Sequence, residues 1–435
     1  MGIIRHFLFF VLMVFFLLQL VYSDDLSELK NQLKDMQGQI KLQAELINNQ
    51  SVKIESMRKK IEELESADNS SKETAPYIEE RVVLLENKVS DFSKNEFLSL
   101  RGMKWQIGGE VELEFVKTKN HASINEDGAH FQLDKVVLSP KVNFTEDIFF
   151  YGNFEFYSDS SSVESAYLQF DNLPGDSFAQ VGIKKRFMEP DRKTERYPLA
   201  GNAFWRDQTA GIFLGGDLEP FYWRFSYTNG YELQEKSATE DASLKIFHDD
   251  LRTAEYSDLG EAGIGLGIKK DLGAAGKFDI LGFSYFSELS PEDETFLESK
   301  ISGYGSDDKK QYRYGANLSY SIKGLNLLVE TIKAKDGDLD RSAWFVQPSY
   351  KIKFPDRKFF TAIEPLFRYG RLNVDTQAVS GNSLTWDRQE FTFALIADVY
   401  KNIKLKTEYT IDKTDEGLDG KKSYGEFVSQ LEIKF

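Results

Sequence analysis

The chain of 435 residues contains no cysteine and only four histidines. The absence of cysteine excludes disulfides, thiolate metal ligands and a cysteine nucleophile. His6 lies in the first apolar segment, and His121, His130 and His248 show neither HxxxH nor HxxE spacing. Because metal centres and Ser-His-Asp triads need histidines that converge, we expect no enzyme activity, no catalytic residue, no metal and no cofactor.

Basic side chains are outnumbered, with 54 Lys and Arg against 70 Asp and Glu and a formal net charge of −16. This acidity disfavours nucleic acid as a partner. The mean hydropathy of −0.43 is too polar for a helical membrane protein, yet aromatic residues make up 14% of the chain. A polar average with many aromatics is typical of a membrane β-barrel, in which lipid-facing and lumen-facing residues alternate.

The long apolar run at the N-terminus, Phe7 to Val21, follows Arg5 and is interrupted only by Gln19. This pattern is typical of a secretory signal, and we expect cleavage after Ser23, so that residues 1–23 form a signal peptide. The alternative is an uncleaved transmembrane anchor, but the run is shorter than the roughly 20 residues that a span requires. Because no cysteine follows the run, a lipoprotein anchor is excluded.

Residues 24–66 carry a seven-residue repeat with two core positions. The core residues are Leu26, Leu33, Ile40, Ile47, Ile54 and Ile61 at one position, and Leu29, Met36, Gln43, Gln50, Met57 and Leu64 at the other. This heptad predicts an α-helical coiled coil, and a dimer and a trimer fit its core equally. We expect a polar linker, 67–77, and a second short coiled-coil helix, 78–100, to follow.

From residue 101 to residue 435 the apolar period changes to two. Sixteen runs alternate between apolar and polar residues, each of roughly ten residues, the length of a tilted membrane strand. They begin near Trp105, Phe131, Ile148, Val163, Phe178, Gln208, Phe221, Ala262, Phe278, Tyr312, Leu325, Trp344, Phe359, Arg388, Ile403 and Tyr424.

The connections between these runs are sorted by length. Short turns alternate with mostly longer loops, which span 119–129, 159–162, 185–207, 230–260, 288–310, 336–342, 371–385 and 413–423. Outer-membrane barrels have short periplasmic turns and longer outer loops, whereas a soluble sandwich has no reason to sort them. The sequence therefore predicts an all-β transmembrane barrel of 16 antiparallel strands over residues 101–435, preceded by an α-helical coiled coil.

The last ten residues alternate in the same way, with Phe427, Leu431, Ile433 and Phe435 on one face. On its own this segment also fits a half-buried strand of a soluble sandwich. After fifteen similar runs, it predicts the strand that closes the barrel against residues 105–115. By resemblance to outer-membrane proteins in general, Phe435 is also expected to be an assembly signal.

The loop 185–207 and its flanks concentrate positive charge in an acidic chain. Seven basic residues stand against three acidic ones, a local net charge of +4, and the basic ones are Lys184, Lys185, Arg186, Arg192, Lys193, Arg196 and Arg206. If the loop narrows a pore, these charges favour anions, because a narrow mouth of low dielectric focuses their field. The alternative is a solvated outer loop whose charges pair with lipopolysaccharide or with one another.

Residues around this loop resemble the phosphate-selective porin O and P family. The resemblance rests on Val181-Gly182, Glu195-Arg196, Asn202-Ala203-Phe204, Arg206 and Gly211. It implies a trimeric barrel of 16 strands whose third outer loop folds inward, with Lys184, Arg196 and Arg206 lining the pore. An N-terminal coiled coil occurs in some members of that family.

Strand parity also points charged residues of both signs into the lumen. The basic ones are Arg224, Arg313, Arg368, Arg388, Lys404 and Lys406, and the acidic ones are Glu110, Glu112, Glu114, Glu155, Glu330, Glu390 and Glu408. This mixture fits a transverse field that orients polar solutes as well as it fits anion selectivity.

Together these features predict a porin of the Gram-negative outer membrane with its coiled coil in the periplasm. We expect a homotrimer in contact with outer-membrane lipid and lipopolysaccharide, with a water-filled channel for small hydrophilic solutes and a preference for small, phosphate-like anions. The alternative is a structural anchor that tethers the membrane to peptidoglycan through the coiled coil. An outer-membrane hydrolase is a third hypothesis, which the histidine count disfavours.

Overall fold

The computed structural model describes residues 97–100, 103–119, 129–186, 190, 192–237, 245–252, 260–301, 303–305, 307–376, 386–416 and 420–435. The expected signal peptide, first coiled coil and linker lie outside these residues and stay predictions. Of the range expected for the second helix only the end is described, where Phe97–Leu100 form a short strand, β1. No helix in the described ranges is long and apolar enough to cross a membrane.

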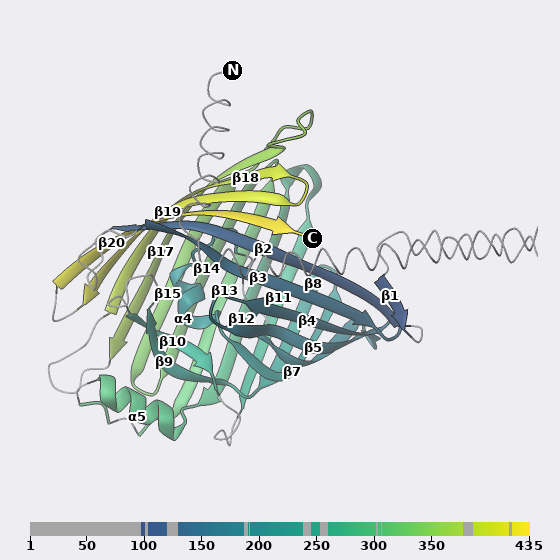
Figure 1. Cartoon of the computed structure of the whole chain (residues 1–435). Coiled ribbons are helices and arrows are strands. Elements are labelled where there is room, and N and C mark those ends of the chain that lie inside the picture. The colour runs from purple at the N-terminus through teal and green to yellow at the C-terminus, as the bar shows by residue number, and fades with distance from the viewer. Residues whose placement is uncertain are drawn as a thin grey trace, which may run out of the picture. The chain divides into compact units, whose positions relative to one another are not determined.

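Within the described residues, eighteen strands share one sheet. β1 and the two-residue β16 (Ile352–Lys353) are short additions, and the other strands form the predicted closed ring of 16 antiparallel strands (Figure 1). In ring order they are β2 (Met103–Lys119), β3 (Ala129–Asn143), β4 (Ile148–Phe156), β5 (Ser161–Leu173), β6 (Ser177–Lys185), β7 (Gln208–Leu218), β8 (Phe221–Thr228), β11 (Glu261–Asp271), β12 (Lys277–Glu288), β13 (Lys310–Ile322), β14 (Leu325–Asp336), β15 (Leu339–Tyr350), β17 (Ala362–Thr376), β18 (Trp386–Tyr400), β19 (Ile403–Glu416) and β20 (Gly420–Lys434).

The ring closes between its last strand and its first long strand. β20 pairs with β2 from Lys434 opposite Glu110 to Gly425 opposite Lys119. Beyond this ladder, Gly109 and Phe435 exchange two backbone hydrogen bonds of 3.0 and 3.1 Å. The predicted closing role of the last strand is therefore confirmed, while the role of Phe435 in assembly stays a prediction.

Apolar side chains cover the outer wall of the ring because every second residue of each strand points outward. Leu266, Ile107 and Phe221 are 65%, 60% and 59% exposed. Outward aromatic rings of neighbouring strands touch, as Tyr369 does with Trp344 and Phe391 at centroid distances of 5.3 and 4.6 Å. Exposed apolar surface of this extent needs an apolar partner, and such a band with aromatic rings is the outer surface of a membrane barrel.

The predicted sorting of connections holds only in part. The long loop expected at 413–423 shortens to 417–419 between β19 and β20, and the short turn expected at 354–357 lies in a longer connection, 351–361, between β15 and β17. The expected long loop 336–342 is a tight turn, with Gly337 at φ +59° and β15 starting at Leu339 instead of near Trp344. The strand start was hidden because the outward residues Asp340 and Ser342 are polar, whereas the inward Leu339 and Ala343 are apolar. The usual alternation of apolar and polar residues is therefore reversed there. At the other end of the barrel, the turn between β11 and β12 contains a short 3₁₀ helix, η1 (Gly273–Ala275).

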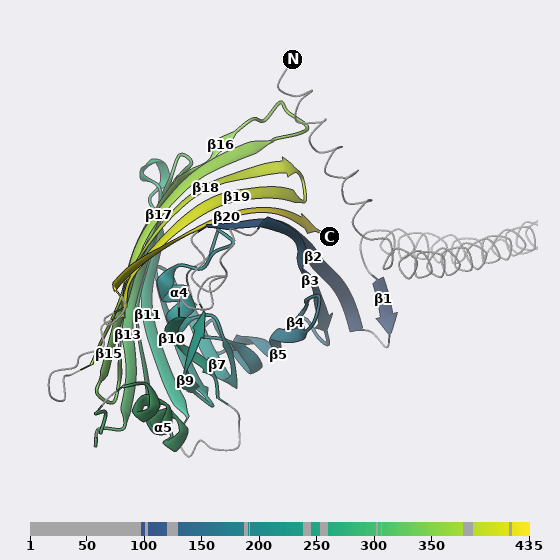
Figure 2. The same cartoon turned by 60° about the vertical axis from the view of Figure 1, so that its left-hand side comes forward.

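Three of the longer connections carry structure of their own. They hold helix α4 (Leu199–Phe204), the hairpin of β9 (Tyr231–Ser237) and β10 (Lys245–Leu251), and helix α5 (Pro291–Lys300). Figure 2 shows α4 and the hairpin inside the ring. We call these three elements the plug.

The plug shares an apolar core with the inner wall of β12–β17. Its buried residues include Leu199, Phe204, Leu233, Ile246, Phe247 and Leu297, and those of the wall include Leu281, Phe283, Ile332, Phe345 and Leu372. Asp293 links two parts of the plug, since its carboxylate caps α5 through Ser290 and also accepts the backbone N–H of Leu233 at 2.6 Å. The water-filled lumen expected from the sequence is therefore restricted by protein along this wall.

Candidate pore constriction

The connection between β6 and β7 crosses the barrel to the opposite wall. In the ring order β17 lies diametrically opposite β6. The Nζ of Lys193 is 2.6 Å from Glu364 on β17, and the backbone N–H of Arg196 donates to Glu408 on β19 at 2.7 Å. Residues 192–197 thus span the lumen instead of standing outside it.

Arg368, on β17, is the central anchor of this crossing segment. Its side chain is 0% exposed and donates to the hydroxyl of Thr194 at 2.5 Å and to the backbone oxygen of Arg196 at 2.9 Å. On the wall itself it pairs with Glu390 at 3.1 Å. Because the guanidinium bonds to two oxygens of the loop, it fixes the position of the segment along the barrel axis and its direction across the lumen.

A second anchor lies at the seam of the barrel. The fully buried side-chain amide of Gln430, on β20, donates to Glu112 and Glu114 of β2 at 3.2 and 2.7 Å and to Glu195 of the loop at 2.8 Å. Burial would raise the pKa of Glu195, but Arg192, Lys406 and Lys135 outweigh it and lower that pKa to about 2. Glu195 therefore stays ionised at neutral pH and holds its hydrogen bond to the seam.

Most of the predicted basic residues of the loop are engaged in ion pairs. Lys185 pairs with Glu164 at 2.8 Å, Arg192 with Glu195 at 3.5 Å, Lys193 with Glu364, Arg196 with Glu426, and Arg186 with Asp249 and Glu261. The other two lie differently. Lys184 donates to Gln180 at 2.8 Å and lies over the ring of Tyr167, and Arg206 is exposed, 5.7 Å from the ring of Tyr197.

Three arginines converge on one carboxylate of the plug. Asp249, on β10, accepts from Arg313 at 2.7 and 2.8 Å, from Arg341 at 2.7 Å and from Arg186 at 2.5 Å. Burial would raise the pKa of Asp249, but the arginines outweigh it and hold that pKa well below its usual range. The cluster holds the hairpin to the inner wall, because a buried ion pair that loses one partner costs about 3–5 kcal/mol.

The other predicted lumen residues do face inward, mostly in pairs of opposite charge. Arg388 pairs with Asp412, and Lys406 pairs with Glu432 at 2.8 Å. Lys404 lies 3.8 Å from Glu432, Glu110 lies 3.3 Å from Lys434, and Arg224 lies 2.8 Å from Asp217. The remaining predicted acids are buried on the lumen side: Glu112, Glu114, Glu155, Glu330, Glu390 and Glu408. Pairing of opposite charges across neighbouring strands explains why both signs share one wall.

The contacts between basic side chains and aromatic rings on the inner wall of β3–β8 were not predicted from the sequence. There, Lys141 lies 3.9 Å from the ring centroid of Phe149, and Arg224 lies 4.9 Å from that of Tyr222. Strand parity places these aromatic rings inward, so it could have identified them. The predicted lumen residues were all charged, and these aromatic residues were not among them.

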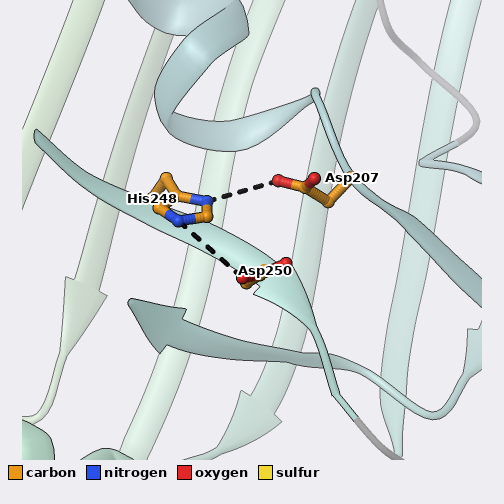
Figure 3. Close-up of side chains that lie close together, drawn as sticks. All are labelled: Asp207, His248 and Asp250. Carbon is orange, nitrogen blue, oxygen red and sulfur yellow. Dashed lines mark hydrogen bonds and ion pairs between the residues drawn. The ribbon is translucent and has the colours of Figure 1, made fainter. Parts of the chain in front are cut away.

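One histidine, treated above as isolated, lies between two carboxylates (Figure 3). Nδ1 of His248 is 3.2 Å from Asp207, and Nε2 is 3.9 Å from Asp250. Burial would raise the pKa of Asp207, but His248 and Lys236 outweigh it and lower that pKa. Because a metal ion binds one nitrogen of a histidine and each nitrogen here faces a different carboxylate, the group fits an imidazole held between two carboxylates better than a metal centre.

Solved structures of outer-membrane proteins share this fold. The outer membrane channel DcaP of Acinetobacter baumannii superimposes with a TM-score of 0.58 at 14% identity, over 78% of this chain and 99% of that one. OprB of Pseudomonas putida gives 0.56 at 9% identity, over 76% and 94%. OmpT of Vibrio cholerae gives 0.50 at 10% identity, over 78% and 100%. No family model matches the chain, and no curated protein does.

The closed ring, the apolar outer wall and these similarities define the class. The chain has the fold of the outer-membrane porins and channels, with 16 strands around a lumen that a loop crosses. At such low identity the similarity establishes the fold alone. The narrower resemblance to phosphate-selective porins therefore stays a prediction.

Proposed function

We propose that this protein is a passive channel of the Gram-negative outer membrane for small hydrophilic solutes, with the segment 192–197 as its constriction. The observation that carries this proposal is the crossing of the lumen by that segment, which Arg368 holds to the far wall and Gln430 to the seam. A barrel of this strand number is wide enough for an aqueous path. A loop fixed across that path sets its narrowest section.

We also propose a preference for small anions, phosphate among them. Most basic residues of the loop are neutralised by ion pairs, so only a few positive charges can support this preference. Arg206 remains from the predicted residues, and Lys141, which lies on the ring of Phe149, joins it from the inner wall. A cation that lies on an aromatic ring keeps its positive charge, so it can still attract a passing anion.

Reversal potentials across a planar bilayer test both proposals. In a gradient of potassium chloride the unmodified protein should show a shift towards the anion side, which Lys141→Gln with Arg206→Gln should reduce. Arg196→Gln should have a smaller effect, because Glu426 already compensates that charge. A cation-selective unmodified channel would contradict the anion preference, and the absence of conductance would contradict the channel itself.

The plug supports a second candidate, the structural anchor. An apolar core packed against β12–β17 blocks part of the lumen. A barrel with no transport role could tolerate such a block. Closed barrels in the bilayer, together with envelope blebbing when the protein is deleted, would favour the anchor. A homotrimer and a periplasmic coiled coil are proposed in either case, and cross-linking of the full chain would test the trimer.

A further inference from the structure

A row of aromatic side chains lines the part of the lumen that the plug leaves open. Phe149 and Tyr151 on β4, Tyr167 on β5, and Phe178 on β6 face inward and are partly exposed. Tyr151 and Tyr167 are direct cross-strand partners, with ring centroids 5.5 Å apart. We call these four residues the aromatic wall.

Glycines of the neighbouring strands make room for two of these aromatic side chains. Phe178 extends over Gly215 of β7, where a Cβ would come within 2.6 Å of its ring. Tyr167 is opposite Gly182 of β6, where a Cβ would meet the backbone and Cβ of that tyrosine. The glycines therefore give these two side chains room against the sheet. Lys184 and Arg224 lie beside them, 5.4 Å from the ring centroid of Tyr167 and 5.5 Å from that of Phe178, and Lys141 lies 3.9 Å from that of Phe149.

Neutral hydrogen-bonding groups accompany the rings. Gln180 donates to Gln169 at 2.7 Å and accepts from Lys184 at 2.8 Å, and Gln169 donates to Asp171 at 2.6 Å. This chain begins at an ammonium group and ends at a carboxylate, so its charges offset each other. Amides offer both donors and acceptors, which suits a solute that carries many hydroxyl groups and no net charge.

We propose that the aromatic wall binds the ring of a neutral sugar during its passage through the channel. A sugar ring has an apolar C–H face that packs on an aromatic ring, whose face is apolar and partly negative. Its hydroxyl rim can then bond to the amides beside the wall. This inference rests on the proposed channel function and assigns a solute class to one wall of the lumen.

Sugar block of single-channel current tests the proposal on the full-length protein in planar bilayers. Glucose and maltotriose are added, and a polyethylene glycol of matched size serves as the probe for simple exclusion. We expect the sugars to reduce the current with a saturating dependence on concentration, and the polymer to reduce it without saturation. Tyr167→Leu and Phe178→Leu should each raise the half-blocking concentration of sugar by about two- to tenfold, the range expected for one aromatic contact.

Outward aromatics of the same strands provide matched controls. Phe150→Leu and Phe170→Leu remove a ring of β4 and β5 from the opposite face, so sugar block should not change. Tyr167→Phe, which keeps the ring, should retain most of the block. Identical effects of sugar and polymer, or block that survives both inward substitutions, would overturn the inference while leaving an open channel and the proposed function intact.

Discussion

Replacing Arg368 by methionine is expected to release the crossing segment from the wall. The change removes the hydrogen bonds to Thr194 and Arg196 at 2.5 and 2.9 Å and leaves Glu390 without its 3.1 Å ion pair. A hydrogen bond from a charged group contributes about 1.5–3 kcal/mol, so the two loop contacts together contribute about 3–6 kcal/mol. Since each 1.4 kcal/mol is a tenfold change, the open arrangement should gain about two to four orders of magnitude in population.

Other anchors limit this gain. Lys193 keeps its 2.6 Å pair with Glu364, and Arg196 keeps its pair with Glu426, so we expect brief openings instead of a permanently open pore. Single-channel recordings at fixed voltage should show frequent excursions to a larger conductance. The unmodified channel should show them rarely.

Arg388→Met is the matched control for the loss of a buried arginine. Arg388 is 1% exposed and pairs with Asp412 on the neighbouring strand. Both variants should lower the temperature at which the folded barrel changes its mobility in a detergent gel, but only Arg368→Met should change the conductance states. Equal current traces for the two variants would refute the reasoning that Arg368 holds the constriction.

Three further predictions concern the plug, pH and the C-terminus. Asp249→Asn should loosen the hairpin, because three arginines lose their common carboxylate. Protease cleavage within 231–251 should then become faster. An unchanged rate of cleavage would contradict the role of the cluster. The pKa of Glu195 is lowered from 4.5 to about 2, so its contribution to the clamp is complete above pH 4.5 and is lost as pH falls towards 2. Current noise should therefore rise only well below pH 4, and a rise near pH 6 would argue against Glu195. Deletion of Phe435 removes the two backbone bonds to Gly109 and should reduce the yield of assembled barrel more than the conductance of barrels that do form.

The outer wall was the most predictable part of the molecule. Lipid favours an apolar band on the outward face of spanning strands, so the 16 strands could be located, most of them within a few residues of their starts. Where the lumen side is also apolar, this signal weakens. Leu281, Phe283 and Tyr285 point inward from β12 into the core of the plug, and nothing in the alternation of that strand shows that its inner face is covered by protein.

The partners of the loop were beyond sequence reasoning for a different reason. Lys193 and Glu364 are 171 residues apart in the chain, and their contact depends on which wall the loop reaches. Charge composition predicted a basic segment correctly but gave no information on which charges would be neutralised. Strand parity did place Arg368, Arg388 and Lys406 on the lumen side, since parity follows from local geometry alone.

The amide of Gln430 joins the first strand, the last strand and the crossing loop at one point. These three contacts can exist together only after β20 has met β2. The bond from Gln430 to Glu195 therefore fixes the crossing loop to the seam of the barrel, whereas its contacts with Arg368 and Glu364 on the far wall do not involve the seam. Closing the barrel thus adds one of the contacts that hold the constriction, and the residue that joins the two ends of the sheet also steadies the narrowest part of the channel.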